Sequence, residues 1–67
     1  MSFRERLKEI RKERGQTQSE VAKAVSVCSE TISSYERGNS SPTPEMIVKL
    51  AKYFGVTTDY LLGVTEI

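Results

Sequence analysis

The sequence predicts a single all-α domain of five short helices, and three observations support this. Apolar residues recur at spacings of three and four, which is typical of helices with one buried face. Hydroxyl residues and glycines stand where these patterns start and stop, as helix caps do. The chain has 67 residues, enough for one hydrophobic core and too few for two. We therefore treat residues 1–67 as one domain.

The first two helices are expected in the N-terminal third of the chain. The first covers residues 2–13, because apolar side chains form one stripe through a charged segment. The stripe consists of Phe3, Leu7 and Ile10. The second covers residues 17–24, where Thr17 and Glu20 have the spacing of a capping box. In such a box each side chain accepts a hydrogen bond from the backbone N–H of the other residue.

A third helix is expected over residues 28–37, close behind the second. Its inward stripe combines Cys28, Ile32 and Tyr35. Gly38 follows where a C-terminal glycine belongs. The connection from the second helix is too short for an extended loop, so we expect a tight corner between the two.

Two further helices are expected toward the C-terminus. One covers residues 44–54, since Thr43-Pro44-Glu45 supplies a hydroxyl cap, a proline at the first helical position and an acid near the positive helix end. The last begins with Thr57 or Thr58 as its cap and ends at Gly63. Its inward side chains are expected to be Tyr60, Leu61 and Leu62.

Composition excludes several classes of function. Cys28 is the only cysteine and histidine is absent, which excludes an internal disulfide, a zinc finger and histidine-based catalysis. No apolar run approaches the ~18 residues that a membrane span needs. A small all-helical chain is also not expected to offer a pocket of the usual ~300 Å³. We therefore expect a cytoplasmic, non-enzymatic protein without metal, cofactor or small-molecule ligand.

The charge balance by itself does not favour a nucleic-acid partner. Ten Lys and Arg against nine Asp and Glu leave a net charge of +1. The bases gather in residues 1–14, where six of them face three acids. The stretch between Arg37 and Lys49 contains no Lys or Arg.

Four segments carry more specific motifs. They are Gln16-Thr17-Gln18-Ser19-Glu20-Val21-Ala22, Ile32-Ser33-Ser34-Tyr35-Glu36-Arg37-Gly38, Pro44 to Phe54, and Gly55-Val56-Thr57-Thr58-Asp59-Tyr60-Leu61-Leu62-Gly63. In this order they resemble the Xre family, the phage repressor and Cro type of helix-turn-helix protein. The resemblance runs from Phe3 to Gly63 and implies a lambda-repressor-like domain. It further implies a dimeric transcriptional repressor that reads a palindromic operator in double-stranded DNA, with the third helix in the major groove.

The resemblance assigns base contacts to Ser29, Glu30 and Ser34, with Thr31 and Arg37 beside them. Helical rotation also turns this side of the third helix outward, and short hydroxyl side chains let a helix approach base edges closely. Phosphate contacts are expected from Thr17, Gln18, Asn39 and Ser40. The alternatives are that the serines are only solvated and that the segment after the third helix is only a connector.

Glu30 directs a negative charge toward a polyanion. It can accept a hydrogen bond from cytosine N4 and so restrict the choice of base pair. It can instead mark a position at which the helix does not read DNA.

The sequence departs from the family pattern at the corner. Ser26 stands where relatives usually have glycine, and Cys28 where they have a Ser or Thr cap. A left-handed serine costs on the order of 1 kcal/mol relative to glycine, so the corner is expected to shift and let Ser26 cap the third helix. Cys28 is expected to be half-buried. The alternative is a redox sensor, because a helix N-terminus lowers the pKa of a thiol.

Arg11 lies at the edge of the first apolar stripe, where an unpaired cation is costly to desolvate. The resemblance pairs it with Glu36 and so braces the first helix against the third. The other bases of the first helix are expected to form a solvated face. These are Arg4, Arg6, Lys8, Lys12 and Arg14.

A homodimer interface is expected at the last helix and the tail, which carry more apolar surface than a small core needs. The residues are Val56, Tyr60, Leu61, Val64 and Ile67. We expect the dimer to form within this domain, because the sequence has no separate dimerisation domain. The alternative function is a helix-turn-helix protein-interaction module or antitoxin-like partner, which the small net charge and Glu30 favour.

Overall fold

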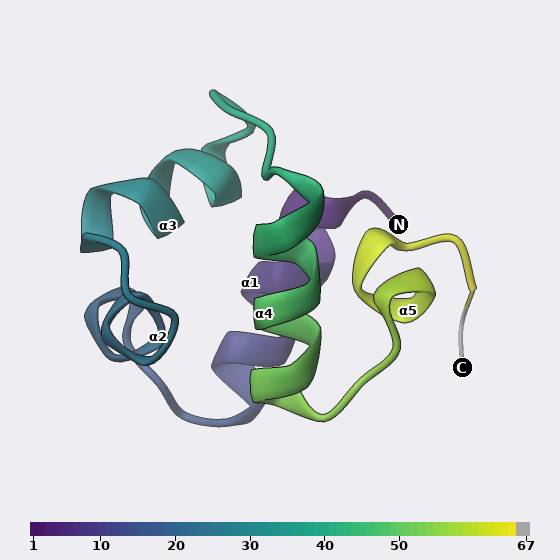
Figure 1. The fold of residues 1–67 in the computed structure, drawn as a ribbon, viewed down its shortest axis with the longest axis horizontal. Coiled ribbons are helices and arrows are strands. Elements are labelled where there is room, and N and C mark those ends of the chain that lie inside the picture. The colour runs from purple at the N-terminus through teal and green to yellow at the C-terminus, as the bar shows by residue number, and fades with distance from the viewer. Residues whose placement is uncertain (66–67) are drawn as a thin grey trace.

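The computed structural model describes residues 1–65, and all regular secondary structure in that range is helical (Figure 1). The helices are α1 (Phe3–Glu13), α2 (Gln18–Ala24), α3 (Ser29–Arg37), α4 (Pro44–Phe54) and α5 (Thr58–Leu62). The all-α, five-helix fold is therefore confirmed. The first three helices begin one residue later than expected, because the residue in front of each has an extended backbone. Within residues 1–65 no helix is long and apolar enough to cross a membrane.

Threonine hydroxyls begin three of the helices, as the sequence indicates. The Thr17 hydroxyl accepts from the Glu20 N–H at 3.0 Å, and the Glu20 carboxylate accepts from the Thr17 N–H at 2.8 Å. This confirms the capping box of α2. At α5 the hydroxyl that caps is that of Thr57, which accepts from the N–H of Tyr60. Thr58 is then the first residue of the helix.

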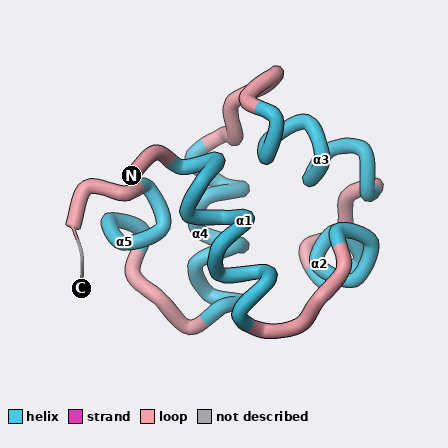
Figure 2. The backbone as a smooth tube through the Cα atoms, turned by 180° about the vertical axis from the view of Figure 1, so that it is seen from behind, coloured by secondary structure: helices cyan, strands magenta, loops and turns pink. Residues whose placement is uncertain are grey.

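The helices surround one core. Figures 1 and 2 show α2 and α3 on one side of α1 and α4, and α5 on the other. α1 packs against both α3 and α5, so it links the two sides. The core consists of Leu7, Ile10, Val21, Ala22, Val25, Ile32, Tyr35, Ile47, Leu50, Ala51, Phe54 and Leu61. Burial of these apolar side chains is the main force that holds the short helices together.

The corner between α2 and α3 does not shift as expected. Ser26 adopts a φ of 63°, in the left-handed region, and the N–H of Val27 donates to the carbonyl of Ala22 at 2.9 Å. These two features close the C-terminus of α2. Cys28 immediately precedes α3 and its side chain makes no capping hydrogen bond. The expectation that Ser26 caps α3 is wrong, because the turn that ends α2 already requires this residue.

Candidate nucleic-acid interface

α2 and α3 form a helix-turn-helix pair. They pack directly against each other across the Ser26 corner. Val21 and Ala22 of α2 and Ile32 of α3 lie in the shared core. This packing leaves Ser29, Glu30 and Arg37 of α3 exposed, and Figure 1 shows α3 at the edge of the molecule. The exposed side of α3 is therefore accessible to another macromolecule.

The outer side of α3 is polar. Ser29, Glu30 and Arg37 are exposed, while Thr31 and Ser34 are half-buried. The three expected base contacts and the two residues expected beside them thus all have access to solvent. The opposite side of the helix contains the buried Ile32 and Tyr35.

Two of these residues form an ion pair along α3. The Arg37 Nη2 lies 3.3 Å from the Glu30 Oε1, and Arg37 also donates to the Ser33 hydroxyl. Both charged side chains remain open to water, at 51% and 70% exposed. The guanidinium is thereby held along the outer side of α3, toward the N-terminus of the helix.

A buried ion pair fixes how α3 sits on α1. The Arg11 Nε donates to the Glu36 Oε2 at 2.7 Å, and the Arg11 Nη2 donates to the Glu36 Oε1 at 3.0 Å. The Glu36 side chain is 4% exposed. Its hydrogen bond raises the pKa of Arg11 above the ordinary value. This is the pairing that the sequence analysis expects.

The same carboxylate also holds Gln18. The Gln18 Nε2 donates to the Glu36 Oε1 at 3.1 Å. The carboxamide at the start of α2 is therefore oriented by a residue of α3. Thr17, directly before it, is exposed and caps α2. These two of the four residues expected to contact phosphate lie at the N-terminus of α2, where backbone N–H groups favour an anion.

The segment after α3 folds back onto the helix. The Asn39 N–H donates to the Ser34 carbonyl at 2.9 Å, and the Ser40 hydroxyl lies 2.9 Å from the Ser34 hydroxyl. Asn39 and Ser40 are both exposed. The two expected phosphate contacts in this segment are thus tied to Ser34 of α3.

A cation from α1 reaches the end of α3. The Arg4 Nη1 donates to the Arg37 carbonyl at 3.4 Å. A Cβ on Gly38 would lie only 2.9 Å from this nitrogen, so the glycine permits the approach. A positive charge at a helix C-terminus is favourable. Arg4 therefore places a positive charge beside the segment after α3, which has no Lys or Arg of its own before Lys49.

Cys28 is exposed, so the expectation of a half-buried residue is wrong. The reason is that Cys28 precedes α3 with an extended backbone and does not continue the inward stripe. Its Sγ lies 3.3 Å from the Thr31 Oγ1. The hydrogen bond with Thr31 lowers the pKa of the Cys28 thiol.

The residues expected to form a dimer interface are not equally available. Leu61 is fully buried, so its assignment to the interface is wrong: its side chain completes the core. Val56 and Tyr60 are half-buried. Val64 is 74% exposed. Ile67 lies outside the described residues.

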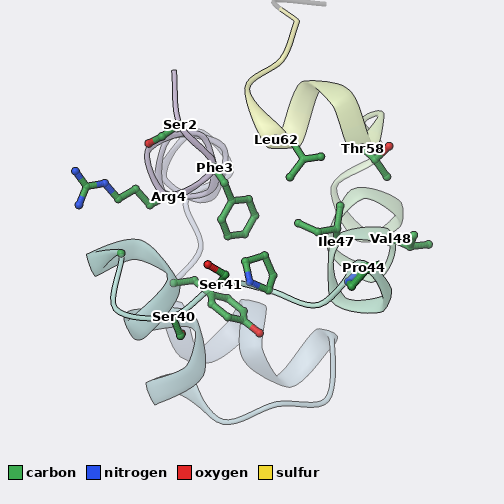
Figure 3. A pocket seen from close by; sticks show the side chains of 13 residues that line it. Ser2, Phe3, Arg4, Ser40, Ser41, Pro44, Ile47, Val48, Thr58 and Leu62 are labelled. Atoms are coloured by element: carbon green, nitrogen blue, oxygen red, sulfur yellow. The ribbon is translucent and has the colours of Figure 1, made fainter.

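A surface groove of about 650 Å³ lies between the start of α1, the segment after α3, α4 and α5 (Figure 3). Phe3, Ile47 and Leu62 line its apolar floor and walls. The expectation that so small a chain offers no such pocket is wrong, because the groove forms at the surface between helix ends and needs no large core. Leu62, expected to face inward, is 39% exposed at this groove, and Val48 beside it is 42% exposed.

The family model for the helix-turn-helix (HTH_3) matches residues 7–61. The chain belongs to this helix-turn-helix family. The match includes α2, α3 and α4 in full, so it covers the helix-turn-helix pair. The family expected from the sequence is confirmed.

The helix-turn-helix chain is similar to named regulators. It is 40% identical over 67 residues to the HTH-type transcriptional regulator ImmR of Bacillus subtilis (strain 168), covering 100% of this chain and 53% of ImmR. It is 38% identical over 64 residues to the cryptic phage CTXphi transcriptional repressor RstR of Vibrio cholerae, covering 96% of this chain and 58% of RstR. It thus spans about half the length of these curated relatives. Both are named as regulators of transcription and neither as an enzyme.

A solved complex shares the helix-turn-helix fold. The P22 c2 repressor, crystallised with a synthetic operator, superposes with a TM-score of 0.87 and 32% sequence identity. The similarity covers 92% of this chain and 94% of that one. The fold described here is therefore one that has been observed on DNA in another protein.

Sequence reasoning missed one buried cation that supports the helix-turn-helix domain. Arg6, expected on a solvated face, is 2% exposed. Its guanidinium carbon lies 4.0 Å from the ring centroid of Tyr60, and its Nη1 lies 3.8 Å from the Glu9 carboxylate. The signal was present, because Arg6 is three residues after Phe3 and four before Ile10. It lies on the apolar stripe itself.

Proposed function

We propose that this chain binds specific DNA sequences and represses transcription. The observation that carries the proposal is the polar outer side of α3, held at a fixed angle to α1 and α2 by Glu36. The similarity to a repressor crystallised with an operator supports it. A small polar helix face suits the major groove, since it lets the backbone approach base edges.

In the proposed complex α3 lies in the major groove and α2 crosses the backbone. Ser29, Glu30 and Ser34 contact base edges, with Thr31 and Arg37 beside them. The side chains and N–H groups at the start of α2 and after α3 contact phosphate. These are Thr17, Gln18, Asn39 and Ser40. Phosphate contacts set the register, while the α3 residues supply the sequence preference.

The proposed regulator acts as a homodimer on a palindromic operator. Two copies bind half-sites roughly 34–36 Å apart, one turn of DNA. Exposed apolar side chains near α5 support a contact there, because Leu62, Val48 and Val64 have no neighbour that covers them within residues 1–65. Val56 and Tyr60 lie at the edge of this region. Removing residues 64–67 is expected to lower the dimer population in sedimentation velocity, and an unchanged profile contradicts the role of the tail.

The decisive experiment is selection of binding sites from a random DNA library at near-physiological salt. Fluorescence anisotropy then measures affinity for the selected sequence and for a scrambled one. A short palindrome with half-sites one turn apart supports the proposal. Recovery of no sequence, with binding only at low salt, contradicts it.

A charge placed on α3 tests the interface directly. Ser29→Asp adds a negative charge at the first position of α3, where an acid is favourable to the helix. It is expected to weaken operator binding at least 10-fold without unfolding the chain, since phosphate repulsion opposes binding. Lys52→Gln on α4 changes the net charge by the same amount and is the matched control. Equal losses in the two variants contradict the assignment of the surface.

The second candidate is a protein-interaction module with the same fold. The net charge of +1 and the base-free segment after α3 favour it. Salt dependence separates the two, because DNA binding loses roughly 0.9 in log K per phosphate for each tenfold rise in salt. A protein partner gives no such slope.

A further inference from the structure

Glu30 and Arg37 are seven residues apart, yet their side chains meet. Seven residues correspond to about two turns of helix, or roughly 10 Å along its axis. Side chains on a helix lean toward its N-terminus, so Arg37 extends back along α3, and the two long side chains together span this distance. The Ser33 hydroxyl, four residues before Arg37, accepts a hydrogen bond from it on the way. The guanidinium therefore lies on the outer side of α3, within reach of both the Ser33 and the Glu30 side chains.

The pair combines complementary hydrogen-bonding groups. A carboxylate only accepts hydrogen bonds, and a guanidinium only donates them. One Glu30 oxygen, Oε1, accepts the hydrogen bond from Arg37. With 70% and 51% of the side chains exposed, both groups keep further hydrogen-bonding capacity toward an incoming ligand.

This arrangement matches the major-groove edge of one base pair. A C·G pair presents the cytosine N4 donor beside the guanine O6 and N7 acceptors. A carboxylate next to a guanidinium offers the complementary groups, an acceptor for the cytosine donor and donors for the guanine acceptors. The adenine–thymine pairs also present a donor, adenine N6, but it stands between two acceptors, adenine N7 and thymine O4. Only guanine offers two adjacent acceptors, O6 and N7, to the guanidinium.

We propose that Glu30 and Arg37 act together as one reader of a single C·G base pair in each half-site. This inference rests on the proposed DNA-binding function. Glu30 accepts from cytosine N4 while Arg37 donates to guanine. Because the two charges cancel, the pair brings no net repulsion to the DNA, which explains how an acid is tolerated on this face. An exposed pair of this kind is weakly held, so it can adjust to the base edge.

The test is site selection with the wild-type chain, Glu30→Ala, Arg37→Ala and the double variant. Alanine favours helix, so α3 is expected to persist, as circular dichroism will check. Each single variant is expected to lose about 10- to 100-fold preference for C·G at the same position of the half-site. The double variant is expected to lose no more preference there than either single one. Lys52→Ala, which removes a cation from α4, is expected to leave the preference unchanged.

Four results would count against this assignment. If the two variants change different positions, or if the C·G preference survives in either, the shared reading is overturned. If Arg37→Ala weakens all sequences equally and lowers the salt slope by about one, Arg37 binds phosphate instead. A wild-type chain that selects no sequence contradicts the DNA-binding function itself, and this inference with it.

Discussion

Arg11 and Glu36 form a two-point ion pair that joins α1 to α3. Two guanidinium nitrogens of Arg11 donate to the two oxygens of Glu36, at 2.7 and 3.0 Å. A third nitrogen donates to the carbonyl of Gln16 at 2.8 Å. The pair is nearly closed to water, and the same carboxylate receives Gln18. One glutamate side chain thus links α1, α3 and the first turn of α2.

Glu36→Ala is expected to lower the free energy of unfolding by about 3 kcal/mol, because it leaves a buried cation without its carboxylate. Urea unfolding followed by circular dichroism measures this. Glu13→Ala removes an exposed acid from α1 and is the control, with an expected change below about 0.5 kcal/mol. Similar losses in the two variants would show that the ion pair has no special role.

The stacking of Arg6 on Tyr60 ties α1 to α5. Tyr60→Leu is expected to destabilise the fold by about 1–2 kcal/mol more than Tyr60→Phe, since only phenylalanine keeps an aromatic face over the buried cation. The comparison is made by thermal and urea unfolding of both variants. Equal stability of the two would argue that only the apolar area of residue 60 matters.

Ser26→Gly is expected to stabilise the chain by about 0.5–1 kcal/mol, because glycine adopts the left-handed backbone at φ 63° without steric strain. For a domain of this size the melting temperature should rise by a few degrees. Lys8→Gly, at an exposed position in the middle of α1, is the contrasting control and should cost about 1 kcal/mol. A loss of stability in Ser26→Gly would contradict the inference that the left-handed backbone of Ser26 is strained.

Cys28 is expected to react faster with iodoacetamide than an ordinary thiol at neutral pH. The Thr31 hydrogen bond lowers the pKa of the thiol, so a larger fraction of it is thiolate at pH values below the ordinary pKa of cysteine. Thr31→Val should slow alkylation at neutral pH. The rates of the wild-type chain and the variant should converge at a pH well above the ordinary pKa of a thiol, where both thiols are ionised. Mass spectrometry of the alkylated chain measures the rates. Identical pH profiles would remove Thr31 as the cause.

Specific DNA should protect the same thiol. Cys28 directly precedes α3, so an operator in contact with Ser29 and Glu30 is expected to cover it. Alkylation should slow several-fold with operator and little with a scrambled duplex at the same concentration. An unaffected rate would place the DNA elsewhere.

Local signals account for the part of this structure that was predictable. Helix ends depend on contacts within four residues, such as the capping box of Thr17 and Glu20, and these can be read directly from the sequence. The ordered motifs predicted the family, and with it the pairing of Arg11 with Glu36. Residues at the centre of an apolar stripe, such as Leu7 and Ile32, were assigned to the core for the same reason.

The sequence by itself therefore determined which segments are helical, how they begin and end, and which family they form. Tertiary structure decided which residues at the margins of each apolar stripe are buried and which are exposed. Arg6 is buried because Tyr60, far away in sequence, covers it, while Leu61 and its neighbour Leu62 separate into core and groove. Periodicity gives a direction around a helix axis, but burial depends on which distant element packs there. That information exists only once the helices have assembled.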